Sequence, residues 1–306
     1  GPTGIAAAYF LGRAGIPVTV FEKSSRLGGV PMQVIPGFRI SEAAIEKDIA
    51  LMQFYGAEIR LNTPAPSVAE LNVAGYTHIF FAVGAGKAGR LNIPGNVVPV
   101  IQWLRDLKVG KKVSLGHVAV IGGGNTAMDA ARAAIRSGAA SATLVYRRTK
   151  RYMPADAEEL ELAMADGVRF LELAAPVAQE NGRLKCERMT LGAPDEKGRR
   201  SPLPTGELME FDCDTVIAAV GEQVEGELFT ANGIAVNDKD IPGFCTNLEN
   251  VYVGGDAMRG PATVVEGIAD AQRFADIVIG APHTLSVQEN AHVTREEAIS
   301  KKGILS

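Results

Sequence analysis

The sequence predicts an α/β fold of two domains, each a parallel sheet covered by helices in three layers, with the second domain inserted into the first. Three observations predict it. Apolar runs that suit buried strands alternate with helix-like segments, which favours parallel sheets with covering helices. A unit of strand, glycine loop and helix occurs twice. A third strand with a glycine turn and a long helix, at about 243–280, has too few strands for a domain of its own, so we expect it to complete the first domain.

The chain opens with GPTGIAAAYFLGRAGIPVTVFEK, a glycine turn that runs directly into an alanine-rich helix. Residues 118–147, VAVIGGGNTAMDAARAAIRSGAASATLVYR, repeat that plan when Gly1 is aligned with Gly124 and Gly15 with Gly138. The second copy has a leading strand and two further glycines that the first copy lacks. Residue 1 therefore corresponds to the second glycine of a G-x-G-x-x-G turn, and we expect the first strand of this domain to be missing and the chain to be a fragment. A Gly-Pro remnant of a removed expression tag is the alternative for the first two residues.

The remaining elements follow from the alternation of apolar runs, turns and helix-like stretches. In the first domain we expect a helix at 4–14, a strand at 18–22, a loop with Gly28 and Gly29, a helix at 41–55, and strands at 58–61 and 78–83. In the second we expect the full glycine turn, helices at 125–137 and 155–165, a β-meander at 169–208 and a strand at 215–220. The expected boundaries are 1–95 with 243–280, then 96–242, and a tail or linker at 281–306, where TREEAIS resembles a helix capping box.

Composition argues against several classes of function. The 31 basic and 35 acidic residues give no general attraction for nucleic acid or for an anionic membrane. The longest apolar stretches, such as IFFAVGAG and VIAAVG, are far below the ~18 residues of a membrane span. Cys186, Cys213 and Cys245 form no C-x-x-C pair, so the sequence supports no disulfide framework, zinc site or redox dithiol. We expect a cytoplasmic protein without a bound metal ion.

The glycine turns predict dinucleotide binding, because backbone N–H groups at the start of a helix must approach a pyrophosphate closely. Gly122, Gly124 and Ala127 give the order G-x-G-x-x-A between a β-branched run and a helix, which is the context that such a motif needs. Two coincidental tight turns are the alternative, but both copies lead through a helix into a second strand.

The two copies differ in charge where the second strand ends. Glu22 ends the first copy and can accept hydrogen bonds from ribose hydroxyls. Arg147 and Arg148 end the second copy, followed by Lys150 and Arg151, and guanidinium groups can bind a 2′-phosphate bidentately. The first site is therefore predicted to take a cofactor without a 2′-phosphate, and the second to prefer NADP(H). A solvated basic loop is the alternative for RRTKR.

A third glycine turn follows a later apolar strand. Gly254, Gly255 and Asp256 end that strand, and a helix starts at Thr263 to Val265. Aspartate there can bind a ribityl hydroxyl, and the helix start can offer N–H groups to a flavin carbonyl. Asp256 can also simply cap a turn.

Taken together, these segments resemble the flavin and NADPH domains of oxidoreductases of the glutamate synthase small-subunit type. The resemblance covers residues 1 to about 280, through GPTGIAAAYFLGRAG, FAVGAGKAGRLNIPG, VIGGGNTAMDAARAA, VYRR and VYVGGDAMRGPATVVEGIA. Within that group, LGAPDEKGRR and AVGEQ are most similar to a selenate reductase iron–sulfur subunit. The resemblance implies two Rossmann-like domains and the cofactors FAD and NADPH.

The resemblance also implies which residues bind these cofactors. The FAD positions are Gly1, Gly4, Glu22, Gly29, Gly84, Gly255, Asp256, Thr263, Val264 and Val265. The NADPH positions are Gly122, Gly124, Asn125, Thr126, Arg147, Arg148 and Arg151. Members of the group carry cysteine-rich iron–sulfur segments outside these domains.

The expected function is hydride transfer from NADPH to FAD, followed by electron transfer to iron–sulfur centres or an acceptor outside the chain. Such transfer needs stacked rings and exclusion of water more than an acid or base, so we assign no catalytic residue. Packing is the expected role of Tyr146 and Met153, although either can border the nicotinamide. A disulfide reductase would need a dithiol near the flavin. A non-catalytic scaffold that binds nucleotide remains the second hypothesis.

Overall fold

The structure, a computed structural model, describes residues 1–196, 198–235 and 244–280. The chain divides into two compact units. The first comprises Gly1–Gln33, Gly37–Lys87 and the chain from Gln223 on, and the second comprises Val34–Pro36 and Ala88–Glu222. The expected tail at 281–306, with its TREEAIS segment, lies outside the described residues. Within the described ranges, no helix combines the length and apolar character that crossing a bilayer requires.

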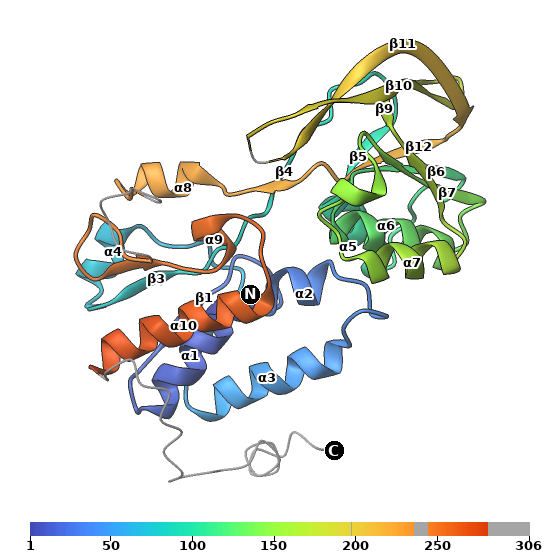
Figure 1. Cartoon of the computed structure of the whole chain (residues 1–306). Coiled ribbons are helices and arrows are strands. Elements are labelled where there is room, and N and C mark those ends of the chain that lie inside the picture. The colour runs from blue at the N-terminus through green and yellow to red at the C-terminus, as the bar shows by residue number, and fades with distance from the viewer. Residues whose placement is uncertain (197, 236–243, 281–306) are drawn as a thin grey trace. The chain divides into compact units, whose positions relative to one another are not determined.

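The first unit contains two pairs of parallel strands with helices around them (Figure 1). Its strands are β1 (Thr19–Phe21), β2 (Glu58–Arg60), β3 (Ile79–Phe81) and β14 (Val251–Val253). Its helices are α1 (Pro2–Arg13), α2 (Gly29–Gln33), α3 (Glu42–Phe54), α4 (Val68–Val73), α8 (Gly226–Ala231), α9 (Asp256–Arg259) and α10 (Val264–Ile279). β1 pairs with β2, and β14 pairs with β3. The chain leaves this unit within β4 (Lys87–Ala88) and returns within β13 (Glu222–Gln223).

Helices α1 and α10 pack against each other through small and aromatic side chains. Ala7 of α1 shares a buried cluster with Ala271 and Phe274 of α10, and Phe274 stacks on Phe80 with ring centroids 4.3 Å apart. A Cβ atom added at Gly267 of α10 would collide with the Thr3 hydroxyl of α1. Glycine at this position therefore permits the close approach of the two helices, which lie at opposite ends of the described chain.

The second unit is built on one parallel sheet with the order β5-β12-β6-β7-β8. These strands are β5 (Val97–Pro99), β6 (His117–Ile121), β7 (Ser141–Tyr146), β8 (Arg169–Glu172) and β12 (Thr215–Ala218). The helices are α5 (Val100–Lys108), α6 (Asn125–Arg136), α7 (Ala157–Ala165) and the short 3-10 helix η1 (Lys150–Tyr152). A separate antiparallel sheet contains β9 (Ala174–Glu180), β10 (Arg183–Pro194) and β11 (Arg200–Asp212).

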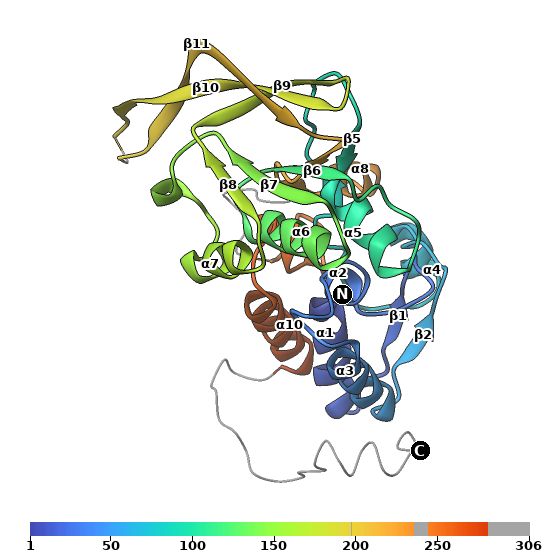
Figure 2. The ribbon, with the colours of Figure 1, turned by 90° about the vertical axis from the view of Figure 1, so that its right-hand side faces the viewer.

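Three layers form this unit: α5, α6 and α7, then the parallel sheet, then the antiparallel sheet (Figure 2). Successive residues of β6 face opposite layers, as the pleat of a strand requires. Val118 and Val120 lie in the core shared with α6, whereas Ala119 and Ile121 lie in the core shared with Leu184 of β10. Because both faces are covered, β6 is apolar at every position from 118 to 121.

The α/β class with parallel sheets, predicted from the sequence, is confirmed. The predicted meander at 169–208 is wrong in its first strand, because β8 pairs in parallel with β7 rather than with β9. The antiparallel sheet starts only at β9. The prediction also missed β5, α4 and α5, which are short or follow a proline.

Candidate functional site

The glycine turn of the second unit connects β6 to α6. A Cβ atom at Gly122 would collide with the carbonyl oxygen of Ala219, and one at Gly123 would collide with the ring of Tyr146. Nothing lies within 4 Å of the Cβ position at Gly124, which precedes α6 without a side-chain cap. The first two glycines therefore serve packing, and the third leaves the helix N-terminus accessible from outside.

Asn125 and Thr126, two predicted NADPH residues, form the first turn of α6. The Asn125 side chain makes a reciprocal pair with Asp156, the residue before α7: its Nδ2 donates to Oδ2 at 3.3 Å, and its Oδ1 accepts from the Asp156 N–H at 3.2 Å. The side chain thus joins the starts of α6 and α7. Thr126 is half-buried.

The predicted arginines follow the end of β7, the strand beside β6. Arg147 and Arg151 are exposed, and Arg148 is half-buried. The Nε atom of Arg148 is buried and has no hydrogen-bond partner in the described structure. Lys150, in the same segment, has an acidic partner, because its Nζ lies 3.7 Å from a carboxylate oxygen of Glu161. Since the carboxyl ends of parallel strands meet at one edge of a sheet, these arginines lie at the same edge as the glycine turn.

The structure brings together two predicted FAD residues at the start of the first unit. Gly29 has φ +60, and a Cβ atom there would lie 2.7 Å from the Cα of Gly1. The Cβ position of Gly4, one turn into α1, lies 3.6 Å from that of Ala82, just after β3. Gly84 follows in the same loop with φ +74 and open space around it. Gly1 precedes α1 without a side-chain cap, so no capping side chain takes the first N–H groups of that helix.

Glu22, the predicted ribose ligand, follows β1 and is held by a serine. Its Oε1 accepts hydrogen bonds from the Ser24 N–H at 2.9 Å and the Ser24 hydroxyl at 2.8 Å. The Gln33 side chain in turn donates to the Ser24 hydroxyl oxygen at 2.8 Å. Ser24 and Gln33 were not predicted from the sequence. The signal for Ser24 was its place two residues after an acid at a strand end.

The turn after β14 contains the predicted residues Gly255 and Asp256. Gly255 has φ +65, and its N–H donates to Asp270 of α10 at 2.8 Å. Asp256 accepts a hydrogen bond from the Ala262 N–H at 3.1 Å. Burial raises the pKa of the Asp256 carboxyl group above its ordinary value, and this hydrogen bond opposes the rise.

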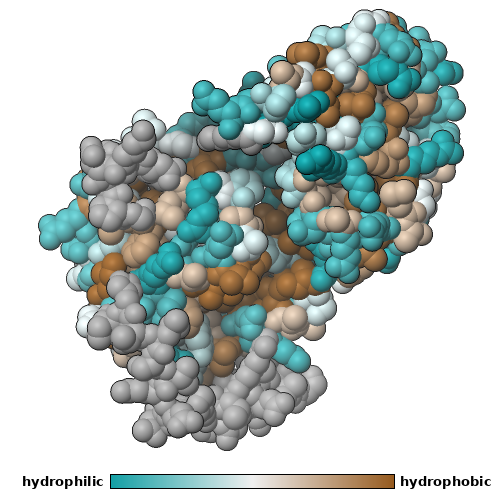
Figure 3. All heavy atoms as spheres, viewed as in Figure 1, coloured by the Kyte–Doolittle hydropathy of each residue, from teal (hydrophilic) through white to brown (hydrophobic). Residues whose placement is uncertain are grey.

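Helix α10 starts with a capping box. The Thr263 N–H and hydroxyl both donate to Glu266, whose own N–H donates back to the Thr263 hydroxyl oxygen. Thr263 is therefore committed to the helix cap, although the sequence predicted its N–H for a flavin. Val264 is 42% and Val265 75% exposed, and Figure 3 shows apolar surface at this end of α10.

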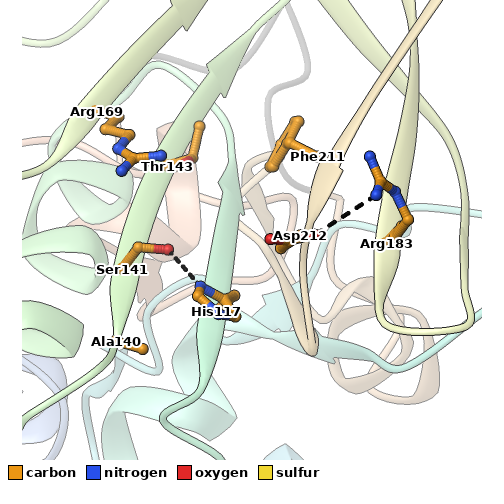
Figure 4. Close-up of a pocket in the computed structure, with 8 residues that line it drawn as sticks. All are labelled: His117, Ala140, Ser141, Thr143, Arg169, Arg183, Phe211 and Asp212. Carbon is orange, nitrogen blue, oxygen red and sulfur yellow. Dashed lines mark hydrogen bonds and ion pairs between the residues drawn. The ribbon is translucent and has the colours of Figure 1, made fainter.

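Two cysteines are buried in the core between the two sheets of the second unit, and a surface pocket lies at the strand ends opposite the glycine turn. Burial raises the pKa of Cys186 to about 12 and that of Cys213 to about 11, and no cluster of acidic, histidine or cysteine side chains in the described residues could hold a metal ion. A pocket of about 350 Å³ lies at the amino ends of β6, β7 and β8, with His117, Ser141 and Arg169 in its wall (Figure 4). Dinucleotides bind at carboxyl ends, so this pocket belongs to neither glycine turn.

The chain is similar to known oxidoreductases. The sequence profile of the pyridine nucleotide-disulphide oxidoreductases matches residues 1–271. YgfK of Escherichia coli K12 is 38% identical over 320 residues, which cover 100% of this chain and 31% of YgfK. The glutamate synthase [NADPH] small chain of Azospirillum brasilense is 31% identical over 316 residues, covering 90% of this chain and 64% of that one. These matches confirm the resemblance to the glutamate synthase small-subunit type.

A solved structure supports the fold. Mycobacterium tuberculosis FprA in complex with NADPH has a TM-score of 0.73 at 22% identity, covering 92% of this chain and 82% of FprA. The likeness extends through both units. The chain spans about a third of YgfK and less than two thirds of the glutamate synthase chain.

Proposed function

The chain belongs to the pyridine nucleotide-disulphide oxidoreductases, and from this premise we propose that it binds FAD and NADPH and transfers electrons between them and an acceptor outside the chain. FAD binding is assigned to the first unit, for which the sequence predicts the bounds 1–95 with 243–280, and NADPH binding to the second unit, for which it predicts 96–242. When bound, the two cofactors would supply hydride transfer from NADPH to FAD and single-electron transfer from the flavin to iron–sulfur centres of another segment or subunit. A cytoplasmic location is part of the same proposal.

The buried Nε atom of Arg148 is the observation that carries the proposal. A buried donor without an acceptor is costly, and a charged donor more so. A 2′-phosphate at the end of β7 would supply an acceptor once the Arg148 side chain turned toward it, with Arg147 and Arg151 near it in sequence and exposed. The pyrophosphate would then bind at Gly124 and the first N–H groups of α6. Because Asn125 pairs with Asp156 through its oxygen and one amide N–H, its backbone N–H and its second amide N–H are the donors that it can offer.

The first unit offers a matching but acidic site. The second oxygen of Glu22 accepts no hydrogen bond within the described structure, so it remains available for a ribose hydroxyl, while Ser24 fixes the carboxylate. Gly1, Gly4 and Gly29 keep side chains away from the start of α1. Gly84, Gly255 and Asp256, with the backbone N–H groups of Val264 and Val265, complete the proposed FAD residues, and Thr263 contributes as the cap of the helix that presents these groups. Glu22 would repel a 2′-phosphate, which supports FAD here and NADPH at the arginines.

Disulfide reduction is not part of the proposal. A thiol attacks a disulfide as the thiolate, and the raised pKa values of Cys186 and Cys213 keep these groups protonated at neutral pH. Both are 0% exposed in the core between the two sheets of the second unit, so a substrate disulfide cannot reach them.

Anaerobic addition of NADPH or NADH to the FAD-loaded protein tests the function. We expect bleaching of the flavin absorbance by both, with a preference for NADPH that falls at least about tenfold in the Arg147→Gln/Arg148→Gln variant, since each charge-assisted hydrogen bond contributes ~1.5–3 kcal/mol. Arg200→Gln, an exposed arginine on β11, is the matched control. Tight FAD binding without bleaching by either nucleotide would instead favour the scaffold. An unchanged preference in the double variant would refute the role of the arginines.

A further inference from the structure

Asp270 is a carboxylate at the middle of α10 that no part of the proposed function uses. It is 0% exposed. Its Oδ2 accepts the Gly255 N–H at 2.8 Å, and its Oδ1 accepts from Nη2 of Arg259 at 2.6 Å. Nη1 of Arg273 lies 3.7 Å from the same Oδ1. The side chain therefore joins α10 to the turn after β14 and to α9.

Packing alone does not require an acid at this position. The buried residues around it on α10 are small or apolar, such as Gly267, Ala271 and Phe274. An ionised carboxylate without water is costly unless both oxygens are paired and hydrogen-bonded. An apolar side chain would avoid that cost, so the carboxylate is explained by what it holds rather than by the space that it fills.

The groups that Asp270 holds determine the conformation of one turn. Gly255 has φ +65 and ψ −150, a region that is essentially confined to glycine. A Cβ atom there would collide with the Thr3 hydroxyl. The hydrogen bond from the Gly255 N–H to Asp270 stabilises this conformation, and the next residue is Asp256. Arg259, four residues from Gly255, is fixed by the other carboxylate oxygen.

We propose that Asp270 is a positioning residue for cofactor binding: it fixes the Gly255–Asp256 turn and thereby aligns Asp256 for a ribityl hydroxyl. The inference rests on the proposed FAD site, but it concerns a residue behind that site. Asp270 is fully buried behind the turn, so it acts through Gly255 and Arg259. Asp256 also accepts a hydrogen bond from the Ala262 N–H, two residues before α10 begins. The Gly255–Asp256 turn is therefore attached both to the segment that leads into α10 and to the middle of that helix.

Two variants separate the two oxygens of Asp270. Asp270→Asn retains an oxygen for the Gly255 N–H and loses the charge that pairs with Arg259. Asp270→Leu loses both interactions. We expect the dissociation constant for FAD, titrated into the flavin-free protein, to rise about tenfold in the first variant and about a hundredfold in the second, as expected for one or more lost charge-assisted hydrogen bonds.

Two controls exclude a merely structural effect. Asp276→Asn makes the same change six residues later on α10, where the acid accepts a hydrogen bond from Gln272, and it should leave FAD affinity unchanged. Phe274→Leu removes the stacking with Phe80, so it should lower the melting temperature while FAD affinity, measured well below unfolding, stays within about twofold. Wild-type affinity in Asp270→Leu, or an affinity loss in Phe274→Leu equal to that of Asp270→Leu, would overturn the positioning role.

Hydrogen exchange keeps this test apart from the proposed function. In the flavin-free protein, the Gly255 N–H should exchange at least tenfold faster in Asp270→Leu than in wild type or Asp276→Asn, because its acceptor is lost. Wild-type protein that binds no FAD would refute the proposed function, whatever the exchange result. Unchanged exchange at Gly255 in Asp270→Leu would refute the hold of Asp270 on the turn, whether or not FAD binds.

Discussion

Two glycines of the second-unit turn should respond in opposite ways to the same substitution. A methyl group at Gly122 would meet the Ala219 carbonyl oxygen. Neither side can move freely, because the Ala219 N–H donates to Ile121 at 2.9 Å and the Gly122 N–H donates to Val145 at 3.1 Å. Gly122→Ala therefore forces backbone shifts between central strands, at a cost of roughly 1–3 kcal/mol in the free energy of unfolding.

Gly124→Ala is the matched partner of that variant. Its Cβ position is open, and its φ of −95 suits alanine, so the free energy of unfolding should change by less than about 1 kcal/mol. The methyl group would stand where a pyrophosphate approaches α6, so the dissociation constant for NADPH should rise about tenfold or more, which corresponds to ~1.4 kcal/mol.

Urea unfolding of the isolated proteins and NADPH titration of the folded ones measure the two quantities separately. We expect Gly122→Ala to lower the free energy of unfolding, and Gly124→Ala to weaken NADPH binding while the free energy of unfolding stays nearly unchanged. If Gly124→Ala proves the more destabilised of the two, the division of this turn into packing and binding glycines is wrong.

Two further predictions concern titration and thiol reactivity. Hydrogen bonds from Arg136, joined by Arg132, lower the pKa of Asp166 to about 2. Because the pKa of Asp166 is lower in the folded than in the unfolded protein, the ionised carboxylate stabilises the fold by roughly 1 kcal/mol after a discount for solvent screening. This stabilisation is complete above about pH 5 and is lost as the pH falls toward 2. The stability difference between wild type and Asp166→Asn should therefore shrink between about pH 6 and pH 3 in urea titrations, and a constant difference would contradict this. In thiol-reagent assays on the folded protein, Cys245 should react first and the buried Cys186 and Cys213 only on unfolding; rapid reaction of all three would show that this core opens.

The sequence predicted what is local. A strand, a glycine turn and a helix occupy one continuous stretch, so the spacing of Gly122 and Gly124 placed that turn correctly. Partners distant in sequence were not predictable: β12 lies between β5 and β6, and β8 joins β7 rather than the meander, because apolar period shows that a strand is buried but not which strand it pairs with. The role of Asp270 was not predictable for the same reason, since its hydrogen bond with Gly255 joins residues fifteen positions apart.

Asn125 and Glu22 show why a motif position does not fix the role of its side chain. Each stands where its motif predicts a cofactor contact, and each already has a protein partner: Asp156 for Asn125 and Ser24 for Glu22. What each side chain has left for a ligand differs. The Asn125 amide uses its oxygen and one of its two N–H groups on Asp156, so its second N–H can still donate. Glu22 uses one oxygen on Ser24, so its second oxygen can still accept. A pyrophosphate needs a donor and a ribose hydroxyl needs an acceptor, so in each case the protein partner orients the side chain and leaves the kind of group that the predicted ligand requires.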